Sequence, residues 1–192
     1  MHANQEEAVP EGVVLVEGIS DRVAIEALAA RRGRVLAAEG IAVVAIGGAQ
    51  AIGRFLDRFG PRGLDVRLAG LCDAGEEREF RRALERAGLG ADLTRSATER
   101  LGFFVCDPDL EGELIRALGA EAVEAVVAAQ GDLGPFRTLQ KQPEWRRRPV
   151  EEQLRRFMGS GGSRKIRYGR LLVDALDLTR VPRPLERVLA AI

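Results

Sequence analysis

The sequence contains one histidine and two cysteines among its 192 residues. The histidine is His2, close to the start of the chain, so a zinc site built on histidine ligands is nearly excluded. Cys72 and Cys106 each end an apolar run, and each precedes an aspartate. We interpret both as buried core residues of a protein from a reducing compartment, and we do not expect a disulfide framework.

Long apolar runs are also missing. No stretch approaches the ~20 apolar residues of a membrane span. The first ten residues are polar and acidic, which is unlike a secretory signal. We therefore expect a soluble cytoplasmic protein that has no membrane partner.

Glycine-rich phosphate loops are missing as well. The first strand-to-helix turn reads E-G-I-S-D where a dinucleotide site would have G-x-G-x-x-G. No G-x-x-x-x-G-K-[ST] occurs anywhere, and GSGGSR at 159–164 is only a weak candidate for a phosphate loop. These absences argue against a dinucleotide enzyme and against a P-loop ATPase in this chain.

The charges balance over the whole chain but not along it. There are 29 basic and 29 acidic residues, yet residues 1–130 hold 22 acids and 15 bases, and residues 131–192 hold 7 acids and 14 bases. The first part therefore has a net charge of −7 and the second a net charge of +7. This split indicates an acidic site beside a basic surface for polyanions, and simple attraction between the two parts explains it equally well.

Four short apolar runs alternate with amphipathic helical stretches up to about residue 110. Runs this short and nearly free of charge are typical of parallel strands that are buried on both faces. The order predicts an α/β fold with a Rossmann-like, mainly parallel four-stranded sheet flanked by helices, followed by a helical C-terminal extension. The predicted strands are 13–16, 41–46, 66–71 and 102–106, and the predicted later helices lie near 111–129, 150–158, 163–177 and 183–191.

Acidic residues follow three of the four predicted strands. Glu17 follows the first strand, Asp21 comes four residues later, and Asp73 follows the third strand. The acids after the fourth strand are Asp107, Asp109 and Glu111. Because ligands of open α/β sheets bind beyond the carboxyl ends of the strands, we expect these side chains to meet at one edge.

Carboxylates that crowd together repel each other unless something positive neutralises them. Hard oxygen ligands select Mg²⁺, Mn²⁺ or Ca²⁺, and a pair of divalent ions about 3.5–4 Å apart is the usual apparatus for phosphodiester chemistry. An acid near a helix N-terminus also stabilises the helix dipole, by only ~0.3–1 kcal/mol. That simpler explanation applies to Asp21, Glu76, Glu77 and Glu111, and it is weakest for Glu17 and Asp73.

This set of residues resembles the signature of a Toprim domain, with a Glu after the first strand (Glu17 in VEG) and an Asp after the third (Asp73 in LCDAG). More narrowly, five segments in this order look like the Toprim domain of OLD-family (overcoming lysogenization defect) nucleases. The segments are VLVEGISD, AIGGAQ, GLCDAG, FFVCDPDLEGEL and GGSRKIRYGRLLVDAL. The resemblance runs from about residue 12 to about residue 178.

The resemblance implies a set of site residues and a cofactor. It implies one or two Mg²⁺ or Mn²⁺ ions and a catalytic lysine at Lys165. The implied metal ligands are Glu17, Asp21 and Asp73, with Asp107, Asp109 or Glu111 completing the cluster.

The chain departs from the family pattern in two ways. Most Toprim domains carry Asp-x-Asp after the third strand, and here Gly75 stands at the second acid, so one ligand is missing unless Glu76 or Glu77 supplies it. OLD-family members usually carry an ATPase on the same chain, and here no such segment occurs. Regulation by ATP would therefore come from a separate ATPase partner.

Lys165 is one of only two lysines, with Lys141, against 27 arginines. It opens the predicted helix 163–177 behind Ser163, which is expected to cap that helix, and it shares a face with Gly169. We hypothesise that its ammonium group stabilises the transition state or the leaving group of a phosphodiester. A structural ion pair with one of the site acids is the alternative.

The C-terminal part carries a belt of arginines, with Trp145 and Tyr168 among them. Such a belt is suited to contacts with the phosphate backbone of a nucleic acid, which do not depend on the base sequence. The alternative is that these arginines only form a solvated helical surface. The candidate nucleic-acid-binding residues are Arg146, Arg147, Arg148, Arg164, Arg167 and Arg170, and Arg155 and Arg156 complete the belt.

The sequence thus predicts a flexible N-terminus at 1–11, a Toprim α/β core at 12–130 and a helical basic extension at 131–192 that packs on the core. The predicted function is divalent-metal-dependent cleavage or nicking of DNA, in which Glu17 is both a metal ligand and an acid/base and Lys165 serves the scissile phosphate. The alternative is a degenerate, non-catalytic Toprim domain that binds nucleic acid or docks onto a separate ATPase. The oligomeric state stays open, with a homodimer as one candidate.

Overall fold

The structure is a computed structural model, and it describes residues 9–192. His2 lies outside the described residues, and so does the part of the predicted flexible N-terminus up to residue 8. No helix in the described part of the chain combines the length and the apolar character that crossing a bilayer requires.

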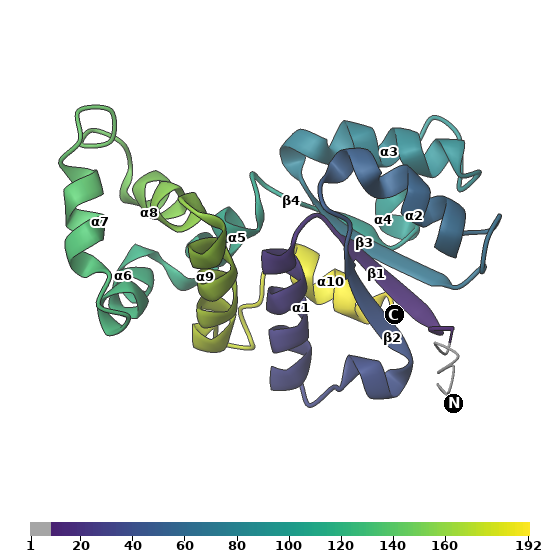
Figure 1. Ribbon diagram of the computed structural model, residues 1–192, viewed down its shortest axis with the longest axis horizontal. Coiled ribbons are helices and arrows are strands. Elements are labelled where there is room, and N and C mark those ends of the chain that lie inside the picture. The colour runs from purple at the N-terminus through teal and green to yellow at the C-terminus, as the bar shows by residue number, and fades with distance from the viewer. Residues whose placement is uncertain (1–8) are drawn as a thin grey trace, which may run out of the picture.

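Four parallel strands form one sheet in the order β2-β1-β3-β4 (Figure 1). The strands are β1 (Gly12–Val16), β2 (Ile41–Ala45), β3 (Arg67–Asp73) and β4 (Phe103–Cys106). The four strands predicted from the sequence are therefore confirmed, with ends that differ by one or two residues. Since β1 pairs with β2 on one side and β3 on the other, its carboxyl end lies beside that of β3.

The central strand β1 is completely buried because helices cover both faces of the sheet. Val14 and Val16 belong to a core formed with α1 (Ile19–Arg31) and α10 (Arg183–Ala190). Val13 and Leu15 belong to a second core formed with α2 (Ile52–Phe59) and α3 (Glu77–Arg86). A short helix, α4 (Arg95–Arg100), precedes β4. The predicted fold class, with a mainly parallel sheet and flanking helices, is confirmed.

Five helices form a lobe beside the sheet, on the left in Figure 1. They are α5 (Leu110–Leu118), α6 (Ala120–Ala129), α7 (Leu133–Gln140), α8 (Val150–Gly159) and α9 (Gly162–Ala175). Helix α9 packs along α1, and one apolar core continues from the sheet into the lobe. The chain then returns to the sheet as α10. The predicted division at residue 130 falls inside this lobe, between α6 and α7.

Three helix predictions differ from the structure. The single helix predicted at 111–129 is two helices, because Gly119 adopts φ 83°, which ends α5. Helix α7 was not predicted, since its first turn contains a glycine and Pro135, a residue that a helix tolerates only near its start. Ser163 lies inside α9, whose N-cap is Gly161, so the expected serine cap is wrong.

Helix α9 approaches α1 closely at Gly169. A Cβ atom at this position would lie 3.1 Å from the backbone oxygen of Ser20. We expect Gly169→Val to lower the free energy of unfolding by about 1–3 kcal/mol, because a rigid backbone atom blocks the added carbon atoms. Thermal denaturation checks this. The control is Gly53→Val on α2, where a Cβ atom meets nothing within 4 Å, and equal midpoints for the two variants would contradict the close approach.

Candidate functional site

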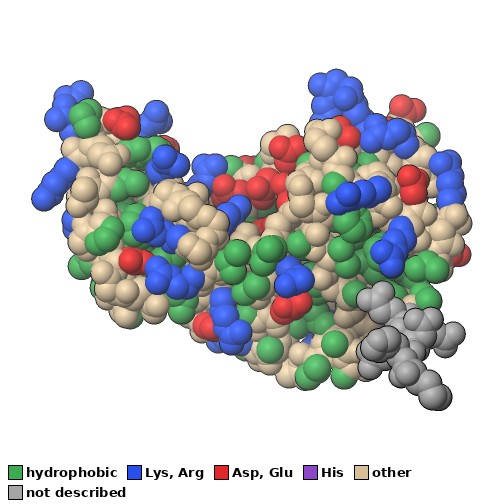
Figure 2. All heavy atoms as spheres, viewed as in Figure 1, with side chains coloured by type: hydrophobic (Ala, Val, Ile, Leu, Met, Phe, Trp, Pro, Cys, Tyr) green, Lys and Arg blue, Asp and Glu red, His purple; other side chains and the backbone are tan. Residues whose placement is uncertain are grey.

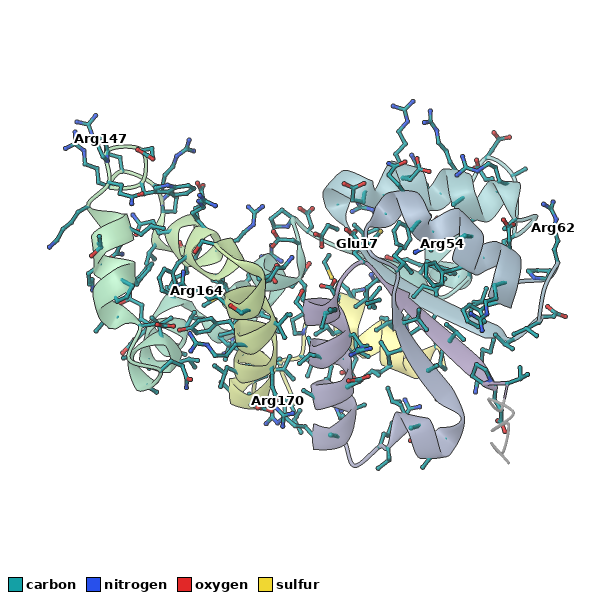
Figure 3. The ribbon with its side chains drawn as sticks, viewed as in Figure 1. Glu17, Arg54, Arg62, Arg147, Arg164 and Arg170 are labelled. Carbon is teal, nitrogen blue, oxygen red and sulfur yellow. The ribbon has the colours of Figure 1, made fainter. Side chains whose placement is uncertain are left out.

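Two of the predicted site carboxylates meet at the carboxyl edge of the sheet. Glu17 directly follows β1, and Asp73 is the last residue of β3. The Oε1 atom of Glu17 accepts a hydrogen bond of 2.8 Å from the backbone N–H of Asp73. Figure 3 shows Glu17 between the sheet and the helical lobe. The two neighbouring parallel strands therefore deliver both acids to one place.

Asp21 lies in the first turn of α1 and its residue is only 8% exposed. Its Oδ2 atom accepts a hydrogen bond of 2.8 Å from the backbone N–H of Gly18. This bond satisfies a free N–H group at the helix start, so the simple capping explanation describes part of what Asp21 does.

A cavity of about 420 Å³ lies at this edge of the sheet. Its lining residues include Glu17, Asp21, Asp73 and Lys165. The starts of α1 and α9 form its walls together with the two glycines that follow β2. Three predicted metal ligands and the predicted catalytic lysine thus share one cavity, although they come from segments up to 148 residues apart.

Burial and neighbouring negative charges disfavour the ionised form of the carboxylates in this cavity. Burial raises the pKa of Asp73 to about 8, and the charges of Glu17, Asp21 and Asp109 add to this. Burial also raises the pKa of Glu17 and of Asp21, while the backbone N–H groups that they accept from act in the opposite direction. A positive charge in the cavity would relieve this repulsion.

Lys165 pairs with Glu111, so the ion pair considered as an alternative from the sequence is present. The distance from Nζ to Oε2 is 3.4 Å, and the Glu111 side chain is 3% exposed. Burial raises the pKa of Glu111 to about 7, although Lys165 counteracts it. Burial alone would lower the pKa of Lys165, but the carboxylates of Glu111, Asp21 and Asp73 outweigh it, so the pKa is raised and the ammonium group stays charged.

The other two acids after β4 have different surroundings. Both oxygens of Asp109 are engaged, because Oδ1 accepts from the backbone N–H of Gly112 at 2.8 Å and Oδ2 from Nε of Arg155 at 2.6 Å. Asp107 is exposed and lies within electrostatic reach of Arg95. Of the three acids predicted to complete a metal cluster, only Glu111 contacts Lys165 in the described part of the chain.

The acids that could replace the missing residue at Gly75 are placed differently from each other. Glu77 pairs with Arg95, whereas Glu76 lies close enough to raise the pKa of Glu17. A Cβ atom at Gly75 would meet nothing within 4 Å. The position that is usually acidic in Toprim domains is therefore open space in this chain.

In the described residues, no three His, Cys, Asp or Glu side chains lie in an arrangement that could hold one metal ion. In both Glu17 and Asp21, one carboxylate oxygen accepts a hydrogen bond from a backbone N–H group. The chemistry of these residues nevertheless fits a hard divalent cation, because carboxylate oxygens are the ligands that such a cation prefers. Burial and mutual repulsion disfavour the ionised carboxylates, and a bound cation would offset both effects. In addition, the buried Oε1 atom of Glu111 has no hydrogen-bond partner among residues 9–192.

The predicted basic belt is spread over the helical lobe. Figure 3 shows Arg147 at the outer tip of the lobe and Arg164 and Arg170 along α9. Arg146, Arg147 and Arg148 lie in the exposed connection between α7 and α8. Figure 2 shows acidic side chains gathered between the lobe and the sheet, with Lys and Arg side chains on both flanks.

Several belt arginines have partners within the chain. Arg167 pairs with Asp132, which also accepts a hydrogen bond of 2.8 Å from the hydroxyl of buried Tyr168. Arg170 pairs with Asp174 at 3.3 Å, Arg148 pairs with Glu152 at 3.6 Å, and Arg164 donates to the Ser160 hydroxyl at 2.7 Å. Asp132 is not among the residues predicted from the sequence, and no local pattern marks it, because its partners come from α9.

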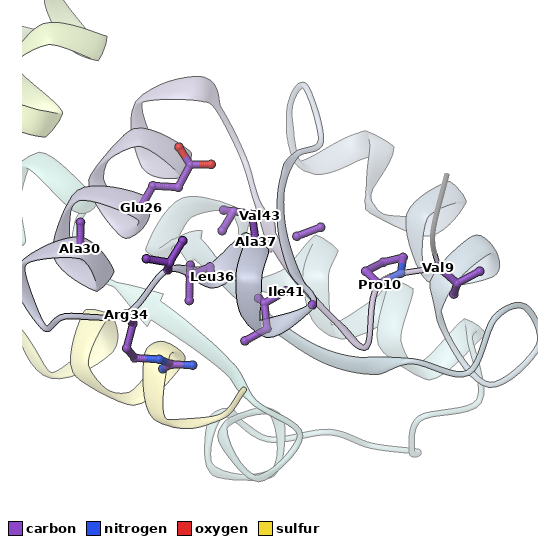
Figure 4. Close-up of a pocket in the computed structure, with 12 residues that line it drawn as sticks. Val9, Pro10, Glu26, Ala30, Arg34, Leu36, Ala37, Ile41 and Val43 are labelled. Atoms are coloured by element: carbon purple, nitrogen blue, oxygen red, sulfur yellow. The ribbon is translucent and has the colours of Figure 1, made fainter. Parts of the chain in front are cut away.

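A larger cavity, of about 630 Å³, lies at the other end of the sheet (Figure 4). Its lining includes Ile41, Ala42 and Val43 at the start of β2 and Arg34 after α1. It contains no cluster of acids, and it is remote from the carboxyl ends of the strands. We therefore place the candidate site in the cavity of about 420 Å³ that Glu17, Asp21, Asp73 and Lys165 line.

One family model and several solved structures resemble this chain. Residues 11–74 match the family model described as "Overcoming lysogenization defect protein-like, TOPRIM domain", and this segment contains Glu17, Asp21 and Asp73. The resemblance to OLD-type Toprim domains is confirmed. No curated protein matches the chain.

Solved structures share the OLD-type fold over nearly the whole chain. The C-terminal region of the Xanthomonas campestris pv. campestris OLD protein has a TM-score of 0.72 and 23% identity, covering 95% of this chain and 94% of that one. The C-terminal region of the Burkholderia pseudomallei OLD protein has a TM-score of 0.73 and 21% identity, covering 95% and 96%. The helical lobe is therefore part of the shared fold, together with the Toprim sheet.

Proposed function

We propose that this protein is a divalent-metal-dependent nuclease that cleaves or nicks DNA at the Toprim carboxylate cavity. The observation that carries the proposal is that Glu17, Asp21, Asp73 and Lys165 line one cavity at the carboxyl edge of the sheet. The OLD-like Toprim match supports it, because the matched segment supplies all three of these carboxylates.

Each residue has a role in this proposal. Glu17, Asp21 and Asp73 would hold Mg²⁺ or Mn²⁺, which when bound supplies activation of water and neutralisation of the phosphate charge. The raised pKa of Glu17 suits a group that also takes up and releases a proton. Lys165, kept protonated by Glu111, donates from Nζ to the oxygens of the scissile phosphate. The arginines of the helical lobe would contact the DNA backbone.

A non-catalytic Toprim domain is the second candidate function. Gly75 supports it, since an acid that is usual in these domains is replaced by open space, and so does the lack of a ready metal arrangement in residues 9–192. Such a domain would bind nucleic acid or dock onto a separate ATPase. A cytoplasmic location, an ATPase partner and a homodimer remain part of the proposal for either function.

Nicking of supercoiled plasmid tests the proposed activity. Incubation with Mn²⁺ or Mg²⁺ is expected to give open circular product, and an excess of EDTA is expected to stop the reaction, because the carboxylates alone do not activate water. Gel electrophoresis measures the conversion, and a protein sample heated to denaturation is the control. Equal conversion with and without EDTA would contradict a metal-dependent nuclease.

A further inference from the structure

A second, smaller cavity opens beside the carboxylate cavity. Its volume is about 290 Å³. Lys165 lines both cavities, so the two share a wall. Its lining includes Trp145 together with three basic and three acidic residues, which are Arg155, Arg156, Lys165, Asp109, Glu111 and Glu152.

Trp145 is held in place by a buried polar residue. The Nε2 atom of Gln153, on α8, donates to the backbone oxygen of Trp145 at 2.8 Å and to that of Arg148 at 3.0 Å. Its Oε1 atom accepts a hydrogen bond of 2.7 Å from Gln140 on α7. Gln153 is 6% exposed, so losing these bonds would leave buried polar atoms unpaired. The connection that carries Trp145 is therefore fixed on both flanking helices.

The cations around the smaller cavity are not equivalent. Arg155 pairs with Asp109, and Lys165 pairs with Glu111. Arg156 has no carboxylate within ion-pair distance among residues 9–192, and its Cζ atom lies 5.9 Å from the centre of the Trp145 ring. An indole and an unpaired guanidinium group thus lie together beside the lysine of the site.

Indole and guanidinium groups both stack on nucleobases, and a guanidinium group also binds phosphate. In a duplex, the bases are stacked inside the helix and do not reach a side cavity. We propose that the cavity at Trp145 and Arg156 takes an unpaired nucleobase adjacent to the phosphate at Lys165. Single-stranded nucleic acid is then the preferred substrate class. The placement of a phosphate at Lys165 rests on the proposed function.

The chain offers a direct probe, because Trp145 is its only tryptophan. We expect a single-stranded oligothymidylate to quench its fluorescence in EDTA, where no cleavage occurs, and a blunt duplex of the same length to leave the fluorescence unchanged. Absence of quenching by the single strand, or equal quenching by the duplex, would overturn the proposal. If this cavity bound a partner protein and no nucleobase, the single-stranded oligothymidylate would not quench the fluorescence of Trp145.

Substitutions in the cavity test the contribution of stacking to the binding affinity. Fluorescence anisotropy of a dye-labelled oligothymidylate measures that affinity. Trp145→Ala and Arg156→Ala are each expected to weaken binding about tenfold, and Trp145→Phe is expected to retain most of the affinity because it keeps an aromatic face. The matched control is Arg100→Ala, an exposed arginine just before β4 at the opposite edge of the sheet. Wild-type affinity of Trp145→Ala would overturn the proposal.

The two proposals fail separately. Quenching of Trp145 in a protein that nicks no DNA under any metal condition would overturn the nuclease function and support a base-binding cavity. Nicking activity without quenching would overturn the base-binding cavity and support the nuclease function.

Discussion

Asp73→Asn is expected to lower metal-dependent nicking by at least about 100-fold and, at the same time, to stabilise the metal-free protein near pH 8. The loss of activity follows because an amide neither carries the negative charge nor binds a hard cation as a carboxylate does. The gain in stability follows because Asp73 is buried next to Glu17 and Asp21, which raises its pKa to about 8.

The direction of the stability change follows from proton linkage. The unfolded chain loses the proton of an aspartic acid near pH 3.9, whereas folded Asp73 keeps it to about pH 8. Between these values the folded state binds more protons, so the free energy of unfolding falls as the pH rises. Asparagine has no such titration. Allowing for the partial exposure of Asp73, the gain near pH 8 is roughly 1–3 kcal/mol and vanishes near pH 4.

Plasmid nicking and urea denaturation at the two pH values measure these effects. The control is Asp57→Asn, which removes an exposed carboxylate from α2 and is expected to change neither quantity. Destabilisation by Asp73→Asn near pH 8 would contradict the repulsion in the cavity. Unchanged nicking would contradict the assignment of Asp73 to the metal.

Mn²⁺ is expected to raise the thermal midpoint of the wild-type protein by about 5–10 °C near pH 8 when its concentration is about 100 times the dissociation constant. The shift is expected to be much smaller near pH 5. At that pH, Asp73 and Glu111, whose pKa values are about 8 and about 7, are protonated, and protons compete with the metal for carboxylates.

Differential scanning calorimetry with and without Mn²⁺ measures this shift, and Asp73→Asn is the matched control. The non-catalytic Toprim domain predicts no shift at either pH. A shift of equal size in Asp73→Asn would show that the ion binds elsewhere and would contradict the proposed ligands.

The strands and the convergence of the site could be predicted because both depend on local patterns. A strand buried on both faces needs an almost continuous apolar run, and the sequence contains four of them. The carboxyl ends of parallel strands meet at one edge, so the sequence alone places Glu17 and Asp73 together. The OLD-like segments indicated the family more narrowly; the family match at residues 11–74 agrees with the first of them, and the solved structures agree with the fold over 95% of the chain.

The ion pairs and hydrogen bonds that could not be predicted depend on contacts between distant segments. The ion pair of Asp109 joins the start of α5 to Arg155 on α8. An ion pair of Lys165 with a site acid was considered from the sequence, but Glu111 on α5 was not singled out as the partner. No local pattern encodes such pairs. The same holds for Gln153 on α8. Its hydrogen bond to the backbone oxygen of Trp145 forms only when the α7–α8 connection packs against it, and no sequence pattern indicates that contact.

The parallel packing of α9 on α1 has a consequence for the charge of the site. Both helices begin at the carboxylate cavity, so two positive dipole ends face the same space as three acidic side chains. A phosphodiester and a cation would each find an opposite charge there. Sliding α9 by one turn, about 5.4 Å, would withdraw Lys165 and one dipole end together. The close approach of Gly169 to the backbone of Ser20, a residue that lines the cavity, therefore fits α9 against α1 in the position that keeps both helix starts there.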